Sequence, residues 1–442
     1  MSDWIDNVPA GWSELPLKRW VDQRITDGPH ETPVLVDEGV PFVSAEAIQD
    51  GRIVFEKQRG FISAEAHRVY CRKCKPMRGD ILLCKSGATT GKLGMVETDD
   101  EFSIWSPLAL IRAHWQKADP RFLFYALQSS YIQNQIQRRW SVGTQPNIGM
   151  GVIETLSVVG PSKREQREIG DFLNRETARI DSLIAKNRRF LELIEERSTS
   201  EVVSVLTGQT RSPSKVSGTE WIGNVPATWE VLPIARTTHL AETGPFGSQL
   251  HAGDYEPGGV PVINPVHLRE GKIEPDENSA VSTETAARLR RHQLAEGDLV
   301  LARRGEVGRC AIVSSREVGW LCGTGSMKLR LKPGHDPQYL NLLMATPGPQ
   351  EQLLLHSVGS TMPNINPTIM SRLVVPVPPQ NDRTAIVNEV TEIRRTAQKL
   401  KEKIDSAIEY LVEYRSALIS AAVTGQIDVR NYRPQEAAAL CQ

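Results

Sequence analysis

The chain has 442 residues, which is too long for one small hydrophobic core and indicates two to four domains. Its 52 basic and 53 acidic residues leave a net charge of −1 and exclude a globally cationic nucleic-acid coat, although DNA binding needs only a local basic face. No apolar run is long enough to span a membrane, no signal peptide is visible, and six cysteines are too few for a disulfide framework. We therefore expect a cytoplasmic protein.

An internal repeat organises the chain. The segment Trp4-Ile5-Asp6-Asn7-Val8-Pro9-Ala10 returns 217 residues later as Trp221-Ile222-Gly223-Asn224-Val225-Pro226-Ala227. The same offset relates Pro146-Asn147-Ile148 to Pro363-Asn364-Ile365, and Thr207-Gly208-Gln209 to Thr424-Gly425-Gln426. Solenoid units have only about 20–50 residues. A period of this length indicates two similar domains in one chain.

Each half begins with a predicted mixed globular part. Apolar runs that follow a Gly-Asp pair, at residues 81–84 and 299–302, predict strands. Residues 120–138 and 337–356 are predicted to begin as helices, because each opens at an Asp-Pro pair. The polar segment 210–218 is predicted to link the two halves.

Each half ends in a long predicted helix. From Ile386 to Ala421 apolar residues alternate at steps of three and four, which is typical of a coiled coil. The first-half counterpart runs from about Lys163 to Leu206, with Ile169, Leu173, Ile180, Leu183, Phe190 and Ile194 as its seam and with interruptions at Glu176, Asn187, Arg197 and Glu201. A helix of this length spans roughly 65 Å. We expect the two helices to pair antiparallel within the chain, and a homodimeric coiled coil is the alternative.

The sequence contains no convincing catalytic or metal-binding motif. Residues 87–93 resemble a phosphate-binding loop but have three residues between the glycines, and Leu93 stands where a metal-binding hydroxyl is needed. A zinc site at His67, Cys71, Cys74 and Cys84 is disfavoured, because the second half has Leu289, His292 and Ala302 at the three cysteine positions. We expect neither a catalytic residue nor a metal.

Basic charge gathers at equivalent places in the two halves. Residues 52–92 contain ten basic and three acidic residues, and residues 288–309 contain six arginines and three acidic residues. Two such segments at matching positions are consistent with phosphate contacts from each half. A solvated charged face is the alternative.

The duplicated series of features resembles the DNA-specificity subunits of type I restriction–modification systems. It consists of an N-terminal Trp-x-x-x-x-Pro-x-x-Trp, a Gly-Val-Pro strand at residues 39–41 and 259–261, a Gly-Asp strand with its Gly-rich turn, a Pro-Asn-Ile segment and a long helix ending in Thr-Gly-Gln. The resemblance covers almost the whole chain.

The resemblance implies an α+β fold with an internal pseudo-twofold repeat, in which two mixed α/β target-recognition domains are separated by a long antiparallel two-helix coiled coil. We expect recognition domains at residues 1–160 and 221–378, spacer helices at 161–208 and 379–424, a linker at 209–220 and a tail at 425–442. The expected function is non-catalytic, sequence-specific binding of double-stranded DNA with an asymmetric bipartite target. Expected partners are two modification (methyltransferase) subunits, which would bring S-adenosylmethionine, and restriction (motor-nuclease) subunits, which would bring ATP and Mg²⁺. No cofactor is expected in this chain.

Two loops and two turns are the candidate DNA-contacting segments. Residues 26–33 resemble the family's Asp-Gly-x-His-x-Thr-Pro loop, and residues 244–250 resemble its Gly-x-Phe-Gly-Ser loop. Polar side chains on such braced turns reach base edges at little ordering cost. The candidate residues are Asp27, His30, Thr32, Lys85, Ser86, Thr89, Thr90 and Lys92 in the first half, and Phe246, Ser248, Gln249, Arg303, Arg304 and Arg309 in the second.

Two readings from other classes stay open at this point. One is a coiled-coil scaffold or adaptor with two protein-binding globular ends. The other is an enzyme with an unrecognised site, such as a nuclease fused to recognition domains. The DNA target itself does not follow from the sequence, because base choice depends on side-chain geometry and DNA shape.

Overall fold

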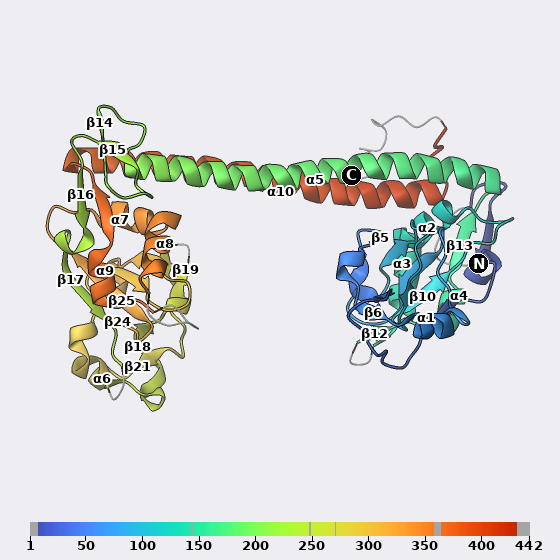
Figure 1. Cartoon of the computed structure of the whole chain (residues 1–442), viewed down its shortest axis with the longest axis horizontal. Helices are drawn as coiled ribbons and strands as arrows, with labels where there is room; N and C mark the ends of the chain where they lie inside the picture. Colours follow the sequence, from blue (N-terminus) through green and yellow to red (C-terminus); the bar gives the residue numbers. More distant parts are fainter. Residues whose placement is uncertain (1–7, 143–144, 247–248, 270, 358–363, 431–442) are drawn as a thin grey trace. The chain divides into compact units, whose positions relative to one another are not determined.

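A computed structural model describes residues 8–142, 145–246, 249–269, 271–357 and 364–430. The chain divides into two compact units, residues 1–189 with 404–442 and residues 190–403. Each unit combines a mixed α/β part with segments of two long helices (Figure 1). These helices, α5 (Lys163–Thr207) and α10 (Gln380–Val423), each continue from one unit into the other.

Unit 1 is built around a four-stranded antiparallel sheet. Its strand order is β2 (Thr26–Asp27), β10 (Leu108–Ile111), β7 (Ile81–Cys84) and β8 (Leu93–Met95). Every residue of β7 and β10 is buried, because both faces of the sheet are covered. Ile81 and Leu83 face the core shared with the helices, whereas Leu82 and Cys84 face a second core beside the smaller sheet. The predicted strand at residues 81–84 is confirmed.

The remaining strands of unit 1 form small sheets around this centre. A three-stranded sheet has the order β6 (Gly60–Ile62), β3 (Val40–Val43) and β9 (Ser103–Ile104), with β3 and β9 parallel. The pairs are β1 (Ser13–Pro16) with β13 (Ser157–Gly160), β4 (Ile48–Gln49) with β5 (Arg52–Ile53), and β11 (Ser141–Val142) with β12 (Pro146–Asn147). The short helices α1 (Ala64–Cys71) and α4 (Met150–Glu154) complete this part.

Unit 2 repeats the two larger sheets and two of the strand pairs of unit 1. Its central sheet has the order β17 (Thr238–Thr243), β25 (Ser326–Leu331), β22 (Leu299–Ala302) and β23 (Cys310–Ile312). The smaller sheet has the order β21 (Ala280–Val281), β18 (Tyr255–Ile263) and β24 (Leu321–Cys322), again with one parallel pair. The pairs are β16 (Glu230–Pro233) with β26 (Val374–Val377) and β19 (Leu268–Arg269) with β20 (Lys272–Ile273). Short helices are α6 (Thr283–Arg288) and α9 (Pro367–Arg372). The predicted duplication is therefore a duplication of fold.

An ion pair with a buried carboxylate recurs at the same place in both central sheets. Asp80 accepts hydrogen bonds from Arg112 at 2.7 and 2.6 Å, and Asp298 accepts from Arg330 at 2.7 Å twice. Each carboxylate also accepts a backbone N–H from the turn before it. The Gly-Asp pair that recurs in the two halves thus supplies the carboxylate of a shared ion pair, which we call the Gly-Asp clamp.

The predicted Asp-Pro helices are confirmed, but each is two helices. Asp119 caps α2 (Pro120–Gln128) and Asp336 caps α7 (Pro337–Met344), each accepting two backbone N–H groups. The chain then turns at Ser129 into α3 (Ser130–Arg139), and at Thr346 into α8 (Pro347–Leu355). Ser129 is extended and caps α3, whereas Pro347 cannot continue a helix.

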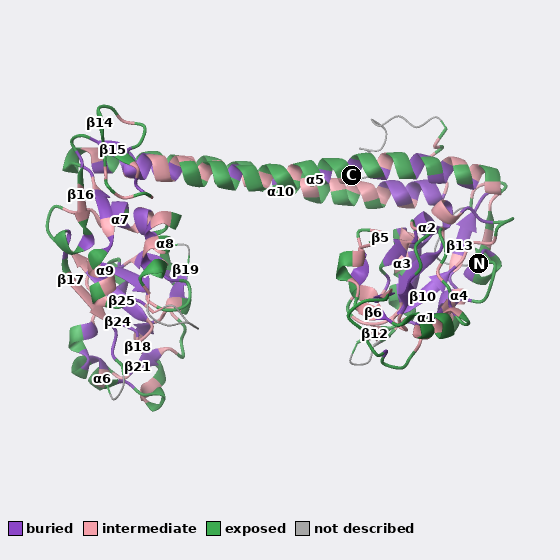
Figure 2. Ribbon diagram, in the orientation of Figure 1, coloured by how far each residue is buried: buried purple, intermediate pink, exposed green. Residues whose placement is uncertain are grey.

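The two long helices pair antiparallel, as predicted. In unit 1 the beginning of α5 packs against the end of α10, and in unit 2 the end of α5 packs against the beginning of α10. Ion pairs join Asp181 to Arg415 at 2.9 Å and Glu195 to Lys401 at 2.8 Å. Figure 2 shows buried residues recurring along both helices. The pairing partner is therefore within the chain.

The predicted seam is partly wrong in register. Of the predicted seam residues, Leu183, Phe190 and Leu400 are 41, 49 and 39% exposed, whereas Ile169, Leu173, Ile180 and Ile194 are buried as predicted. Ile184, which was not predicted, is also buried. In α5 the inward positions continue from Leu173 in alternating steps of four and three to Ile184. The buried stripe includes a polar residue, Thr177. The prediction followed the more apolar residues instead and therefore placed Leu183, rather than Ile184, on the inward face.

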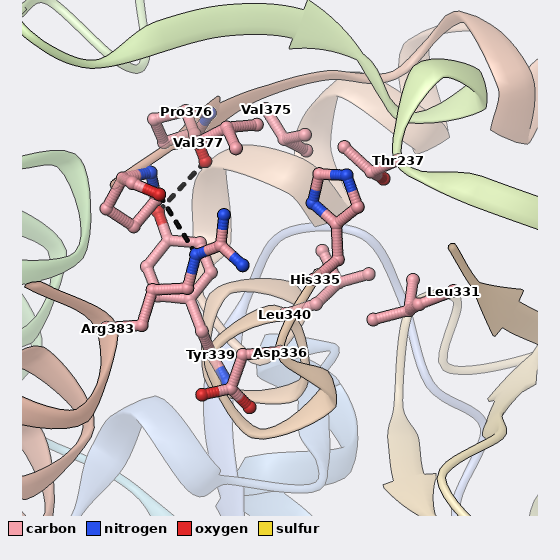
Figure 3. Close-up of a pocket in the computed structure, with 11 residues that line it drawn as sticks. Thr237, Leu331, His335, Asp336, Tyr339, Leu340, Val375, Pro376, Val377 and Arg383 are labelled. Atoms are coloured by element: carbon pink, nitrogen blue, oxygen red, sulfur yellow. Dashed lines mark hydrogen bonds between the residues drawn. The ribbon is translucent and has the colours of Figure 1, made fainter. Parts of the chain in front are cut away.

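Hydrogen bonds join the N-terminal end of α10, which we call its root, to the globular part of unit 2. The Arg383 guanidinium donates from Nε to the carbonyl of Pro378 at 2.9 Å, and the Tyr339 hydroxyl lies 3.0 Å from the carbonyl of Pro376 (Figure 3). The adjoining cavity of about 20 Å³ has room for one water molecule, and so it is not a ligand pocket. In unit 1 Gln166 donates in the same way to the carbonyls of Pro161 and Lys117.

The segment predicted to be a linker is partly ordered as a hairpin. Strand β14 (Ser214–Val216) pairs with β15 (Asn224–Pro226), and all three residues of β14 are exposed. The polar composition of this segment therefore does not prevent its backbone from pairing as a strand. In the described ranges, no helix is long and apolar enough to cross a membrane.

Candidate nucleic-acid interface

The first reader loop, residues 26–33, starts from a buried carboxylate. Asp27 is fully buried, and its oxygens lie 2.5 Å from Lys73 Nζ, 3.3 Å from Lys85 Nζ and 3.0 Å from His30 Nε2. Burial by itself raises the pKa of Asp27, but the hydrogen bond and charge of Lys73, with help from Lys85, outweigh it and lower this pKa. Asp27 is an anionic anchor beneath the loop, and it does not face solvent.

The backbone of this loop is held at three carbonyls. Lys73 donates to Gly28 at 3.3 Å, the Ser106 N–H donates to Pro29 at 3.2 Å, and Trp105 Nε1 donates to Glu31 at 3.2 Å. Because these contacts fix the loop from below, its remaining polar side chains are presented to solvent. His30 is 67% exposed and Thr32 is exposed as well.

The Gly28 position admits no side chain. A Cβ atom there would lie 1.8 Å from the carbonyl oxygen of Ile104, which belongs to the backbone. The second reader loop, residues 244–250, makes the same close approach, because a Cβ on Gly244 would lie 2.0 Å from the carbonyl oxygen of Gly323. Both loops therefore pass in close contact with the backbone at the C-terminal end of a strand, β9 for the first loop and β24 for the second.

The first Gly-rich turn, residues 85–92, is closed by the Pro-Asn-Ile segment. The Ile148 N–H donates to Lys85 at 2.8 Å, and the Gly87 N–H donates to Pro146 at 3.0 Å. The Thr90 hydroxyl lies 2.8 Å from the Gly87 carbonyl. Ser86 forms a backbone bridge with residue 147, and Thr89 is half-buried. Two features that the sequence shows as separate repeats thus form one structural unit.

The two predicted lysines of this turn have different surroundings. The Lys85 side chain is only 13% exposed and is paired with Asp27, so it connects the turn to the reader loop. Lys92 is exposed, and it forms no ion pair with any residue that the structure describes. Of the two, only Lys92 is available to a phosphate without breaking an internal contact.

The second reader loop also starts from a carboxylate held by basic residues. Glu242 lies 2.8 Å from Arg291 Nη2 and 3.6 Å from Lys328 Nζ. Lys328 is 2% exposed and donates to the carbonyls of Arg291 and Gln293. Burial lowers the pKa of Lys328, and the neighbouring Glu242 opposes that effect.

The side chains of the second loop are less polar than those of the first. Phe246 is 62% exposed, and Gln249 is exposed with its carbonyl accepting from Arg288 at 3.0 Å. Ser248, which was predicted to contact DNA, lies outside the described residues. An exposed aromatic ring beside an amide offers stacking or methyl contact together with hydrogen bonding.

The three arginines of the second turn differ in availability. Arg303 donates to the Ile365 carbonyl at 3.0 Å and to Asn364 Oδ1 at 2.9 Å, and burial lowers its pKa. Arg309 donates to the Leu268 carbonyl and pairs with Glu306. Arg304 is exposed. Arg303 therefore joins the second turn to its Pro-Asn-Ile segment, as Lys85 does in the first turn. Arg304 is the most exposed of the three arginines.

The sequence missed the residues that hold the loops. Lys73 was counted only as part of a basic run, and Glu242 and Lys328 were not singled out. Trp105 bears no local signal, because it stands 74 residues from the carbonyl it binds. Such supports are visible only when strands distant in sequence are brought together.

The disfavoured zinc site receives no support from the geometry. Cys71 Sγ lies 3.5 Å from His67 Nε2, but burial raises the pKa of Cys74 to about 12 and that of Cys84 to about 11, which opposes metal-binding thiolates. Among the residues that the structure describes, no group of three or more His, Cys, Asp or Glu is placed to hold a metal ion.

Comparison with known families decides the class of protein. Residues 34–191 and 240–410 match the family described as type I restriction modification DNA specificity domain. The two matched segments together cover more than half of the chain. The chain belongs to this family. It is a DNA-specificity subunit, which binds DNA sequence-specifically and is itself non-catalytic. Specificity subunits carry no cofactor.

Curated relatives agree along much of the chain. The specificity subunit of the type I restriction enzyme EcoBI from Escherichia coli is 18% identical, over 72% of this chain and 68% of that protein. The EcoKI specificity subunit from Escherichia coli K12 is 19% identical over 69% and 65%. The MjaVIII specificity subunit from Methanocaldococcus jannaschii is 26% identical, over about half of each chain, 47% and 48%.

Solved structures share the fold. A chain described under complex assembly and conformational transition of the type I R-M system has a TM-score of 0.68 at 16% identity, and covers 96% of this chain and 100% of its own. The HsdS subunit from Thermoanaerobacter tengcongensis has a TM-score of 0.55 at 17% identity, over 97% and 100%. The predicted fold class, with its two paired long helices, is confirmed.

Proposed function

We propose that the two units of this specificity subunit read the two unlike halves of an asymmetric bipartite DNA target. Residues 1–160 and 221–378 are the proposed recognition domains, and residues 161–208 and 379–424 the proposed spacers. The observation that supports this is the contrast between framework and loops. Two central sheets of the same strand order present loops of different chemistry, with His30 and Thr32 in one and Phe246 and Gln249 in the other.

The bases would be read by the exposed loop residues, and phosphates by exposed basic residues of the turns. Histidine and threonine donate to and accept from base edges, whereas phenylalanine stacks or contacts a thymine methyl group. Lys92 and Arg304 are exposed on the corresponding turns and suit the sequence-independent backbone. Asp27 and Lys85 are proposed positioning residues, because their charges are engaged with each other under the loop.

The chain works within a type I restriction–modification complex. We propose that two modification subunits supply S-adenosylmethionine and the methyl transfer, and that restriction subunits supply the ATP- and Mg²⁺-dependent motor and the nuclease. The coiled-coil scaffold alternative loses its basis, because family membership assigns DNA specificity to the chain.

Replacing loop residues should change one half of the target at a time. We expect His30→Ala with Thr32→Ala to relax base preference in one half-site, with a discrimination loss of about 1–3 kcal/mol for each lost base contact. Phe246→Ala should instead affect the other half-site. The measurement is genome-wide mapping of methylated sites in cells that carry the complete complex.

The control is Arg164→Ala, which removes an exposed residue paired with Glu168 on α5 and should leave the methylation motif unchanged. A palindromic motif from the wild-type complex, or one set of loop variants altering both halves equally, would contradict the proposed division of labour.

The helix pair should set the number of unread bases between the half-sites. Seven residues inserted into both helices beside Glu195 and Lys401 keep the heptad register and lengthen the pair by about 10 Å. At a rise of about 3.4 Å per base pair, we expect a gap longer by two or three bases, with both half-sites unchanged. Inserting two residues rotates the seam off its partner and should reduce soluble yield. An active complex with an unchanged gap would show that the helices do not set the interval.

A further inference from the structure

Unit 1 contains a large cleft apart from its reader loop. The cleft has a volume of about 900 Å³, and its walls come from the β4–β5 hairpin, the end of the first Gly-rich turn, α2 and α3, and both long helices. All of its lining residues belong to unit 1. A space of this size admits a segment of a macromolecule, unlike the small cavity at the root of α10.

Besides Arg415, which pairs with Asp181, three basic residues on three different elements line this cleft. Arg52 comes from β5, Lys92 from the Gly-rich turn and Arg188 from α5. All three residues are exposed, and none forms an ion pair or side-chain hydrogen bond with a residue that the structure describes. Two acidic residues also line the cleft, Asp50 and Asp181, but Asp181 is neutralised by Arg415 at 2.9 Å.

The fold itself does not require unpaired basic charge at these positions. Unit 2 repeats the topology, yet the residue that corresponds to Lys92 is Arg309, which is already paired with Glu306 and bonded to the Leu268 carbonyl. At the repeat offset of the helices, Arg188 corresponds to Asp405. In unit 2 Lys272 stands at the position of Arg52, so two of the three positions stay basic and only that of Arg188 becomes acidic. Lys92 differs from Arg309 in having no partner among the described residues, which leaves its charge available to an external anion.

We infer that Arg52, Lys92 and Arg188 form a phosphate-binding cleft in which unit 1, including the spacer helix α5, grips the DNA backbone. This inference rests on the proposed function and extends it, because it adds a helix residue to the DNA contacts. DNA is favoured over a protein partner, since Lys92 joins the cleft to the turn beside the reader loop and the three free basic charges outnumber the acidic charge of Asp50. The contact is independent of base sequence.

The test measures binding of the assembled complex to a target duplex and to a random duplex over a range of salt concentrations. Each lost phosphate contact should reduce the slope of log K against log salt by about 0.9. We expect Arg52→Ala, Lys92→Ala and Arg188→Ala each to reduce it by about that amount on both duplexes, and the triple variant by about three times as much. The methylated motif should not change. Arg164→Ala, which removes an equal charge from the same helix, should leave the slope unchanged.

If the salt slopes of the triple variant are unchanged on both duplexes, the proposal that the cleft binds DNA phosphates is wrong. It is also wrong if variants keep their slopes but lose their partner subunits in size-exclusion chromatography, because the cleft would then be a protein-binding surface. If wild type lacks preference for any target, the proposed function fails, while the slope on random DNA still decides whether the cleft binds phosphates. Thermal unfolding of each variant shows that the fold is retained, as expected for exposed side chains without partners.

Discussion

Replacing Asp80 with alanine is expected to destabilise unit 1 by about 3–5 kcal/mol, because it leaves the Arg112 guanidinium without its counter-ion. Asp80 is 1% exposed and accepts two hydrogen bonds from Arg112 and one from the Met77 N–H. The pairing raises the pKa of Arg112, with the hydrogen bond to Asp80 as the largest cause. The arginine stays charged, and three hydrogen bonds are lost together.

Asp298→Ala is the matched variant in unit 2. Its partner Arg330 is 38% exposed, compared with 25% for Arg112, so water replaces more of the lost interaction. We therefore expect a smaller loss than in Asp80→Ala. The measurement is chemical denaturation of the full chain, with hydrogen exchange reporting which unit opens.

Asp99→Ala serves as the control, because its pair with Arg78 joins side chains that are 78 and 57% exposed. Such surface pairs contribute about 0–1 kcal/mol. An Asp80→Ala protein as stable as Asp99→Ala would show that the Gly-Asp clamp does not stabilise the repeated sheet.

Gly28→Ala is expected to abolish recognition of one half-site while the other is kept. The added Cβ would lie 1.8 Å from the Ile104 carbonyl oxygen and 2.8 Å from the Cα of Trp105, and neither backbone atom can move without disturbing strand β9. The loop must then lift away from Lys73 and Trp105, which bind its carbonyls. His30 and Thr32 would lose their fixed positions, and base contacts need fixed geometry.

The same change in the second loop, Gly244→Ala, should remove preference in the other half-site only, because its Cβ would lie 2.0 Å from the Gly323 carbonyl oxygen. Gly151→Ala is the control within unit 1, since it lies in helix α4 with no atom within 4 Å of its Cβ, and alanine suits a helix better than glycine. Methylation mapping reads all three variants. A Gly28→Ala complex with an unaltered motif would show that the position of this loop does not govern base choice.

The sequence by itself predicted the duplication, the Gly-Asp strands, the Asp-Pro helices and the antiparallel helix pair. These features depend on local signals: a fixed repeat offset, a buried apolar run, a capping carboxylate followed by proline, and a heptad pattern. The inward row of α5 was wrong at Leu183 and Phe190, which are exposed although they are strongly apolar.

Only the tertiary structure decided which candidate residues are free to meet DNA. Asp27 and Lys85 are 58 residues apart in sequence, and the pairing of β2 with β10, and of β10 with β7, brings them together under the reader loop. Lys92 and Arg188 line one cleft because α5 packs against the globular part of unit 1. A charge in sequence is only a potential contact. Its availability depends on whether the fold supplies a partner for it, and that partner comes from strands and helices far away along the chain.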